Sequence, residues 1–181
     1  VYANETKENS VAAPTAGLHF SKSQLTQIEE KGVEIVYITL DIGLGTFSPI
    51  RSENIEEHAM HQEKVSVDKK TANRINKVVE SDSRVIAVGT TVLRCLESVY
   101  TKFNKIQPYE GETDLFIYPG YKFGVVDSLL TNFHLPKSSL FILVCAFGGT
   151  QNLKSAYRHA IEQNYKFFSY GDAMLINKFE G

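Results

Sequence analysis

RVIAVGTTVLRCLESVYTKF, residues 84–103, is the stretch that decides the fold class. Residues 84–91 are largely apolar and β-branched, which predicts a strand that ends in Gly-Thr-Thr. Residues 92–103 place Leu93, Leu96 and Tyr100 at helical spacing, so a helix follows at once. A strand that runs directly into a helix is typical of α/β proteins.

The segments on both sides continue this alternation. Ser21 and Gln24 resemble a capping box, and Asp68 is placed to cap a second helix. We predict helices at 21–31, 69–80, 139–147 and 152–165, and strands at 33–40, 63–67, 113–118, 125–133 and the end of 167–176. The sequence therefore predicts one α/β domain over 1–181, with a mixed, largely parallel or barrel-like sheet flanked by helices. Ligands of such sheets bind beyond the carboxyl ends of the strands.

Composition limits the possible functions. The 181 residues are 43% hydrophobic, which suits one domain with a buried core, and the net charge is −2. A nucleic-acid-binding domain normally has a basic excess, so this charge balance argues against that class without excluding a local basic patch. Cys95 and Cys145 lie in separate apolar runs, and no signal peptide is evident, so we expect buried free thiols in a reducing compartment. The longest apolar run, 139–147, is too short to span a membrane.

The Gly-Thr-Thr corner is the first candidate binding element. Gly89 would let the backbone approach a ligand, and Thr90 or Thr91 would cap the helix, whose free N–H groups favour anionic groups. A cap without any ligand is the structural alternative. Arg94 lies one turn further on and would bind a carboxylate, or it would simply pair with Glu97.

Two further loops carry polar or glycine residues. GLGT, 43–46, follows a predicted strand and permits close ligand approach, but Ser48 stands where a dinucleotide-binding fingerprint needs its third glycine. HAMHQE, 58–63, does not have HExxH spacing and has no cysteine pair beside it, so we expect no metal. A ligand-facing or acid–base role is the preferred interpretation for His61 or Glu63.

Histidine, tyrosine and aspartate occur in three other loops. His19 and His134 each lie beside a phenylalanine in a turn, where they would either hydrogen-bond the backbone or face a pocket. Tyr118 and Tyr121 flank a Pro-Gly turn, and their rings would stack on a base or cover an edge of the core. Asp172 follows a glycine and would stabilise its own turn, bind a ribose hydroxyl or act as a base.

Seven segments together resemble the S-adenosylmethionine:tRNA ribosyltransferase-isomerase family of queuosine biosynthesis. They occur in order over nearly the whole chain and are VAAPTAGLHF, DIGLGTFSPI, HAMHQE, IAVGTTVLRCLES, TDLFIYPGYKF, VVDSLLTNFHLPKSSL and YKFFSYGDAMLI. Members of this family are longer, and the chain resembles their C-terminal part, the S-adenosylmethionine side. The resemblance therefore implies a fragment that lacks an N-terminal segment and a small inserted β domain.

The resemblance also implies a reaction. The ribosyl moiety of S-adenosylmethionine is transferred and isomerised onto the 7-aminomethyl-7-deazaguanine base of tRNA, which gives epoxyqueuosine-tRNA and releases adenine and methionine. S-adenosylmethionine is then a co-substrate, and no permanently bound cofactor or metal is expected. The implied partners are S-adenosylmethionine and tRNA, without a membrane. The implied location is the cytoplasm, and the full-length family member is expected to be a monomer.

This chemistry needs a base beside the sulfonium and an acid for the departing adenine, and histidine suits both roles near neutral pH. We therefore predict His19, His134 and Asp172 as catalytic residues, with both imidazoles facing one pocket. The predicted substrate-binding residues are Thr15, Gly17, Gly43, Gly45, Thr46, His61, Gly89, Thr90, Thr91, Arg94, Tyr118, Tyr121 and Asn132.

Three alternatives remain open at this stage. An S-adenosylmethionine-dependent methyltransferase would have an acidic, glycine-rich loop after its first strand, which DIGLGTF matches only in part. An inactive nucleoside-binding fragment would expose apolar surface where the missing half packs. A metal hydrolase built on His58 and His61 would contain metal after purification.

Overall fold

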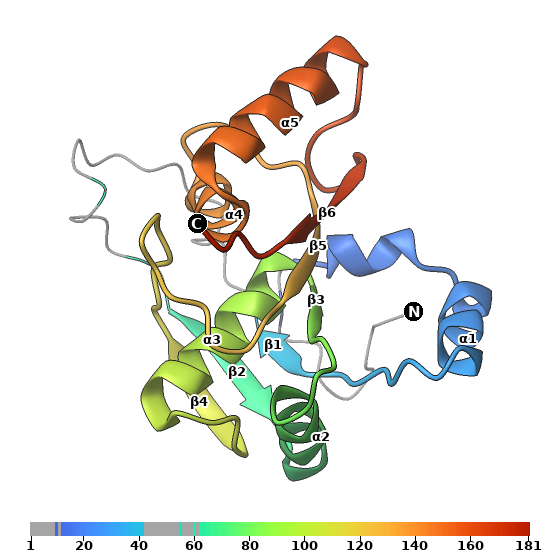
Figure 1. Cartoon of the computed structure of the whole chain (residues 1–181), viewed down its shortest axis with the longest axis vertical. Coiled ribbons are helices and arrows are strands. Elements are labelled where there is room, and N and C mark those ends of the chain that lie inside the picture. Colours follow the sequence, from blue (N-terminus) through green and yellow to red (C-terminus); the bar gives the residue numbers. More distant parts are fainter. Residues whose placement is uncertain (1–9, 11, 42–54, 56–59, 61) are drawn as a thin grey trace.

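The structure is a computed structural model that describes residues 10, 12–41, 55, 60 and 62–181. Its described strands form two three-stranded sheets (Figure 1). The first sheet has the order β1 (Thr39–Asp41), β2 (Glu63–Val67) and β4 (Tyr109–Thr113). The second has the order β3 (Ile86–Val88), β5 (Ser128–Asn132) and β6 (Ala173–Asn177). The helical elements are η1 (Thr15–His19), α1 (Lys22–Glu30), α2 (Lys69–Val79), α3 (Thr90–Phe103), α4 (Ser139–Gly148) and α5 (Thr150–Glu162).

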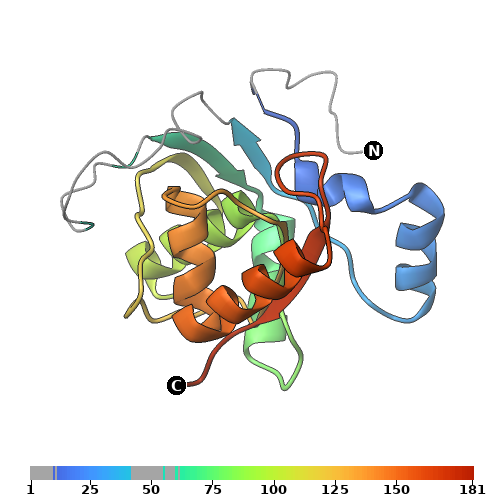
Figure 2. The ribbon, with the colours of Figure 1, turned by 90° about the horizontal axis from the view of Figure 1, so that it is seen from above.

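Helix α3 connects the two sheets through the core. It contacts β3 and β5 of one sheet and β4 of the other (Figure 1). Its side chains Leu93, Leu96 and Val99 are almost completely buried and belong to one hydrophobic cluster with residues of both sheets. Helices α3, α4 and α5 lie together in the body of the molecule, whereas α1 projects from one side (Figure 2). Helix α1 accordingly has no buried residue.

The predicted helices form where local signals placed them. Ser21 and Gln24 make both hydrogen bonds of a capping box at the start of α1, and Gly32 follows this helix with a φ of +83°. The Asp68 carboxylate accepts the N–H of Thr71 at 2.8 Å and caps α2. Both caps are confirmed because capping depends only on residues within one helical turn.

Two predicted strands differ from the structure. In 33–40 only the end is a strand, and the side chains of Val33 and Tyr37 are 49% and 55% exposed, so this segment is not a buried strand. In 113–118 only Thr113 belongs to a strand, because β4 comes earlier, at Tyr109–Thr113. Strands need a partner for their backbone hydrogen bonds, and β2 offers partners only to Thr39–Asp41 and Tyr109–Thr113.

The α/β class and the mixed sheet are confirmed, but parallel pairing is limited to β3 and β5 among the described strands. The β5–β6 pair is antiparallel, with Asn132 opposite Ala173. Two consecutive helices, α4 and α5, separate these strands, so the chain returns to the end where β5 stopped and runs back beside it. This return brings the loop before β6 to the carboxyl end of β5.

Candidate functional site

The carboxyl ends of β3 and β5 meet at one edge of the second sheet. These strands are parallel with Val88 opposite Leu130, and the Gly89 N–H donates to the Leu130 carbonyl at 2.8 Å. Gly89 has a φ of +105°, a conformation that other residues rarely adopt, and it leads directly into α3. A Cβ added there would lie 3.9 Å from the Ala16 side chain, so η1 covers this corner.

Asn132, the last residue of β5, is the centre of the candidate site. Its side chain is 3% exposed, and its Nδ2 atom lies 3.0 Å from His19 Nε2. The same Nδ2 atom donates to the Gly171 carbonyl at 3.4 Å, whereas Oδ1 has no hydrogen-bond partner among the described residues. Asn132 thus joins η1, β5 and the loop before β6. We call Gly89, His19, Asn132 and Gly171 the β5-end cluster.

The loop at 166–172 is held in shape by its own backbone and by Asp172. The Asp172 carboxylate accepts the Lys166 N–H at 2.7 Å, and the Asp172 N–H donates to the Lys166 carbonyl at 2.8 Å. Phe168 has a φ of +72°, and its N–H donates to the Phe133 carbonyl at 2.9 Å. The Asp172 carboxylate therefore closes its loop across six residues and does not form the expected Asx turn, and its predicted catalytic role stays a prediction.

His134 lies just beyond β5, and its Nε2 atom is 2.9 Å from the Thr131 hydroxyl oxygen. Its backbone N–H donates to the Tyr157 hydroxyl at 2.9 Å. Burial lowers the pKa of His134 to about 4, so the ring is neutral at pH 7. Burial also raises the pKa of Tyr157.

The two predicted catalytic histidines approach opposite faces of β5. His134 contacts Thr131 and His19 contacts Asn132, and successive side chains of a strand point to opposite faces. The single pocket expected for both imidazoles therefore has no support in these contacts. Only His19 belongs to the β5-end cluster.

Arg94 has a different partner from either of those expected. It is 2% exposed and forms a buried ion pair with Glu63, at the start of β2, rather than with Glu97 or a ligand carboxylate. The expected pair with Glu97 is therefore wrong, and the ligand-binding role of Arg94 stays a prediction. Burial, with a second contribution from the Glu63 charge, raises the pKa of the neighbouring Cys95 thiol to about 12.

Glu97 is an important residue that the sequence interpretation missed. It is fully buried, and its carboxylate accepts the N–H groups of Gly124 at 2.8 Å and of Val125 and Val126 at 3.0 Å each. These bonds hold the segment just before β5 against α3. The available signal was an acidic residue between Leu96 and Val99 on a mostly apolar helix, since such an acid needs buried partners.

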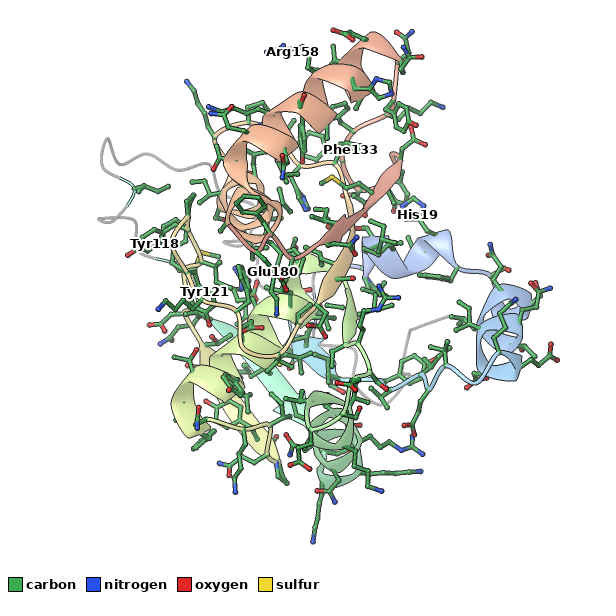
Figure 3. The ribbon with its side chains drawn as sticks, viewed as in Figure 1. His19, Tyr118, Tyr121, Phe133, Arg158 and Glu180 are labelled. Atoms are coloured by element: carbon green, nitrogen blue, oxygen red, sulfur yellow. The ribbon has the colours of Figure 1, made fainter. Side chains whose placement is uncertain are left out.

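Tyr118 and Tyr121 lie away from the β5-end cluster. Gly120 has a φ of +103°, and the Tyr121 N–H donates to the Tyr118 carbonyl at 3.1 Å, which confirms the predicted Pro-Gly turn. The Tyr121 hydroxyl is 2.8 Å from the Thr101 hydroxyl, and its ring packs at 4.9 Å on Phe123. Figure 3 shows both tyrosines on the opposite side of the molecule from His19. Tyr121 therefore covers an edge of the core.

The remaining predicted residues divide into two groups. Thr15 and Gly17 belong to η1, and Thr90 and Thr91 form the first turn of α3, where Gly89 takes the cap position without a side-chain hydrogen bond. The expected threonine cap is therefore wrong, since Gly89 has no side chain and the helix begins at Thr90. Four predicted residues lie outside the described residues, namely Gly43, Gly45, Thr46 and His61.

Within the described ranges, no group of three or more histidine, cysteine, aspartate or glutamate side chains is placed to hold a metal ion. His58 and His61 lie outside those ranges, so the described residues do not test the metal-hydrolase alternative. None of the helices in the described part of the chain is long and apolar enough to cross a membrane. Cys95 and Cys145 are both free and buried, as expected.

Comparison with known proteins relates this chain to one family. The family described as Queuosine biosynthesis protein matches residues 1–176. A Coxiella burnetii protein named S-adenosylmethionine:tRNA ribosyltransferase-isomerase is 54% identical over 171 residues, which are 94% of this chain and 50% of that protein. A Natranaerobius thermophilus protein of the same name is 55% identical over 176 residues, which are 97% of this chain and 51% of that protein. This chain spans about half the length of these relatives.

A solved structure has the same fold. The crystal structure of an S-adenosylmethionine tRNA ribosyltransferase from Thermotoga maritima matches with a TM-score of 0.74 and 41% identity. The match covers 89% of this chain and 51% of that chain. The fold similarity therefore extends over most of this chain and about half of the other.

Proposed function

This chain belongs to the queuosine biosynthesis protein family, and from that premise we propose that it carries the S-adenosylmethionine side of a tRNA-modifying ribosyl transfer. In the proposed reaction, the ribosyl moiety of S-adenosylmethionine is transferred and isomerised onto the aminomethyl group of 7-aminomethyl-7-deazaguanine in tRNA. Adenine and methionine leave, and epoxyqueuosine-tRNA forms. S-adenosylmethionine is thus consumed as a co-substrate, and tRNA is the partner.

The observation that carries this proposal is the β5-end cluster. Four of the segments that resemble the family, at His19, Gly89, Asn132 and Gly171, are far apart in the sequence and meet at this point. They meet at the carboxyl edge of the only described parallel strand pair, which is where α/β sheets bind their ligands. Convergence of four segments at this edge supports a ligand site better than any of the motifs alone.

Each part of the cluster suits a part of S-adenosylmethionine. The first turn of α3 follows Gly89 without a side-chain cap, so its N–H groups remain available to an anionic group such as the methionine carboxylate. His19 is exposed and presents an imidazole beside this corner, next to a loop with the exposed rings of Phe168 and Tyr170. Flat aromatic rings of this kind suit the adenine base. The adenine would then lie over the loop and the carboxylate at the helix.

The test combines binding with product analysis. We expect S-adenosylmethionine to bind the folded chain in isothermal titration, and the Gly89→Val variant to lose this binding because valine cannot adopt the backbone of Gly89. Incubation with S-adenosylmethionine and tRNA that carries 7-aminomethyl-7-deazaguanine is expected to release adenine and methionine together. S-adenosylhomocysteine as the product would instead support methyl transfer. The absence of binding, with folding verified by circular dichroism, would overturn the assignment of the S-adenosylmethionine site to this chain.

A further inference from the structure

We infer that Asn132 is a positioning residue that fixes the tautomer of His19, so that this imidazole offers an N–H group to the ligand through Nδ1 rather than a lone pair. The identity of the ligand rests on the function proposed above. The tautomer itself rests only on the contacts of Asn132, which are present without any ligand.

The orientation of the Asn132 amide follows from Gly171. A backbone carbonyl can only accept a hydrogen bond, and the Gly171 carbonyl lies 3.4 Å from the Asn132 side-chain nitrogen. With the amide turned over, its oxygen would face the Gly171 oxygen, and both are acceptors. Asn132 is 3% exposed, so water is not available in bulk to separate two such atoms. The NH₂ group therefore points toward Gly171.

The same NH₂ group determines the state of His19. It lies 3.0 Å from His19 Nε2, and an amide NH₂ can only donate. Nε2 must then be the acceptor, so the proton of the neutral ring is on Nδ1. His19 is exposed, and Nδ1 has no hydrogen-bond partner in the described part of the chain. The free side of the ring is therefore an N–H donor that faces outward from the cluster.

This arrangement changes the role expected for His19. A general base needs an available lone pair, and the lone pair of this ring is directed at Asn132. Taking up a proton at Nε2 would place two donors against each other and break the Asn132 contact. His19 is therefore placed to donate a hydrogen bond through Nδ1 to an acceptor atom of the bound nucleoside, and the proton beside the sulfonium is removed by another group.

The tautomer can be observed directly in the ligand-free chain. We would label histidines with ¹⁵N and record long-range ¹H–¹⁵N spectra at pH 8, with His19→Asn to assign the His19 signals. We expect Nδ1 of His19 to have the shift of a protonated nitrogen and Nε2 that of an unprotonated one. His159 of α5 is exposed and serves as the control, for which we expect the mixture of tautomers of a free side chain. Protonation of His19 at Nε2 would overturn the inference.

A substitution at position 132 tests the cause. Asp has nearly the shape of Asn but can only accept, so Asn132→Asp is expected to move the His19 proton to Nε2. An unchanged Nδ1–H tautomer in a folded Asn132→Asp variant would show that Asn132 does not set it, and would overturn its positioning role. If this variant does not fold, the wild-type spectrum still decides whether the tautomer is the one inferred.

Ligand binding separates this inference from the proposed function. The side-chain amide of Asn places its NH₂ near the position of Nδ1, whereas that of Gln places it near Nε2. We expect His19→Asn to bind S-adenosylmethionine at least tenfold more tightly than His19→Gln. The reverse order would overturn the donor role of Nδ1. A wild-type chain with the Nδ1–H tautomer that binds no S-adenosylmethionine would refute the proposed function and the donor role, and leave the positioning of His19 by Asn132 intact.

Discussion

Glu97 and Asn132 are both buried polar side chains that fasten distant segments together, yet their hydrogen-bonding states differ. Both oxygens of the Glu97 carboxylate are satisfied, by three backbone N–H groups of Gly124, Val125 and Val126. Asn132 uses its NH₂ group twice, and its Oδ1 atom has no hydrogen-bond partner among the described residues. The first centre is complete and serves stability. The second keeps an acceptor atom, Oδ1, without a partner at the edge of a sheet, and a binding site requires such polar atoms.

Replacing Glu97 by Gln should have the largest effect on stability. Gln keeps the size but loses the charge, and its NH₂ group would face at least one backbone N–H. We expect the free energy of unfolding to fall by about 4 kcal/mol, because buried N–H groups lose their acceptors. Urea denaturation measures this loss. Glu110→Gln on an exposed strand position is the matched control, with an expected change within about 0.5 kcal/mol. An effect of Glu97→Gln as small as that of Glu110→Gln would contradict the stabilising role of the Glu97 carboxylate.

His134 adds a pH dependence to the end of β5. Burial lowers its pKa from 6.5 to about 4, so the unfolded chain takes up the proton first as the pH falls. Stability is therefore fully present above pH 6.5 and is lost between pH 6.5 and about 4, by at most about 3 kcal/mol. The free energies of unfolding of the wild-type chain and of His134→Gln, measured by denaturation at several pH values over this range, should change with pH at different slopes. Parallel pH profiles would contradict the neutral, buried state of this ring.

Gly89 and Gly120 allow the location of the site to be tested at two glycines with nearly the same φ angle. Their φ angles are +105° and +103°, and an added Cβ would clash with nothing at either position. We expect Gly89→Ala and Gly120→Ala each to cost about 2 kcal/mol from backbone strain alone. Only Gly89→Ala should weaken S-adenosylmethionine binding in isothermal titration, by tenfold or more. Weaker binding in Gly120→Ala alone would place the ligand at Tyr118 and Tyr121 instead.

Asp172→Asn should have the smallest effect on folding. The exposed carboxylate accepts the Lys166 N–H, and an Asn oxygen can replace it, so we expect a change of unfolding free energy below about 0.5 kcal/mol. If Asp172 has the predicted catalytic role, adenine release should nevertheless fall at least tenfold. Chromatography of the products after incubation with S-adenosylmethionine and tRNA measures this. Unchanged release would restrict Asp172 to closing its loop.

The sequence predicted the helices well because their signals are local. The caps at Ser21 and Asp68 and the glycine after α1 each act within one or two turns. The strands at 33–40 and 113–118 were misplaced because β-branched composition reports a preference, whereas a strand also needs a partner. The partner in both cases is β2, whose position relative to these segments depends on the whole fold.

The candidate site could be predicted only in part for the same reason. Glycine, histidine and asparagine in loops identified Gly89, His19 and Asn132 as candidates, since those residue types are unusual in such positions. The partners could not be predicted, because Arg94 pairs with Glu63 across two elements and Glu97 bonds to a segment beyond β4. The two histidines lie on opposite faces because they contact Thr131 and Asn132, which are successive residues of β5. The loop motifs alone do not indicate which residue of β5 each histidine contacts.

The junction at Asn132 also has a consequence for the order of events during synthesis. It joins His19, near the beginning of the described chain, to Gly171, near its end. Contacts between residues this far apart form late, since most of the chain must be ordered before they can close. A ribosome-bound chain that stops after α5 already has β3, β5 and the Glu97 centre, but not the Gly171 carbonyl that orients Asn132. Ligand binding should therefore appear only after the loop before β6 has been synthesised.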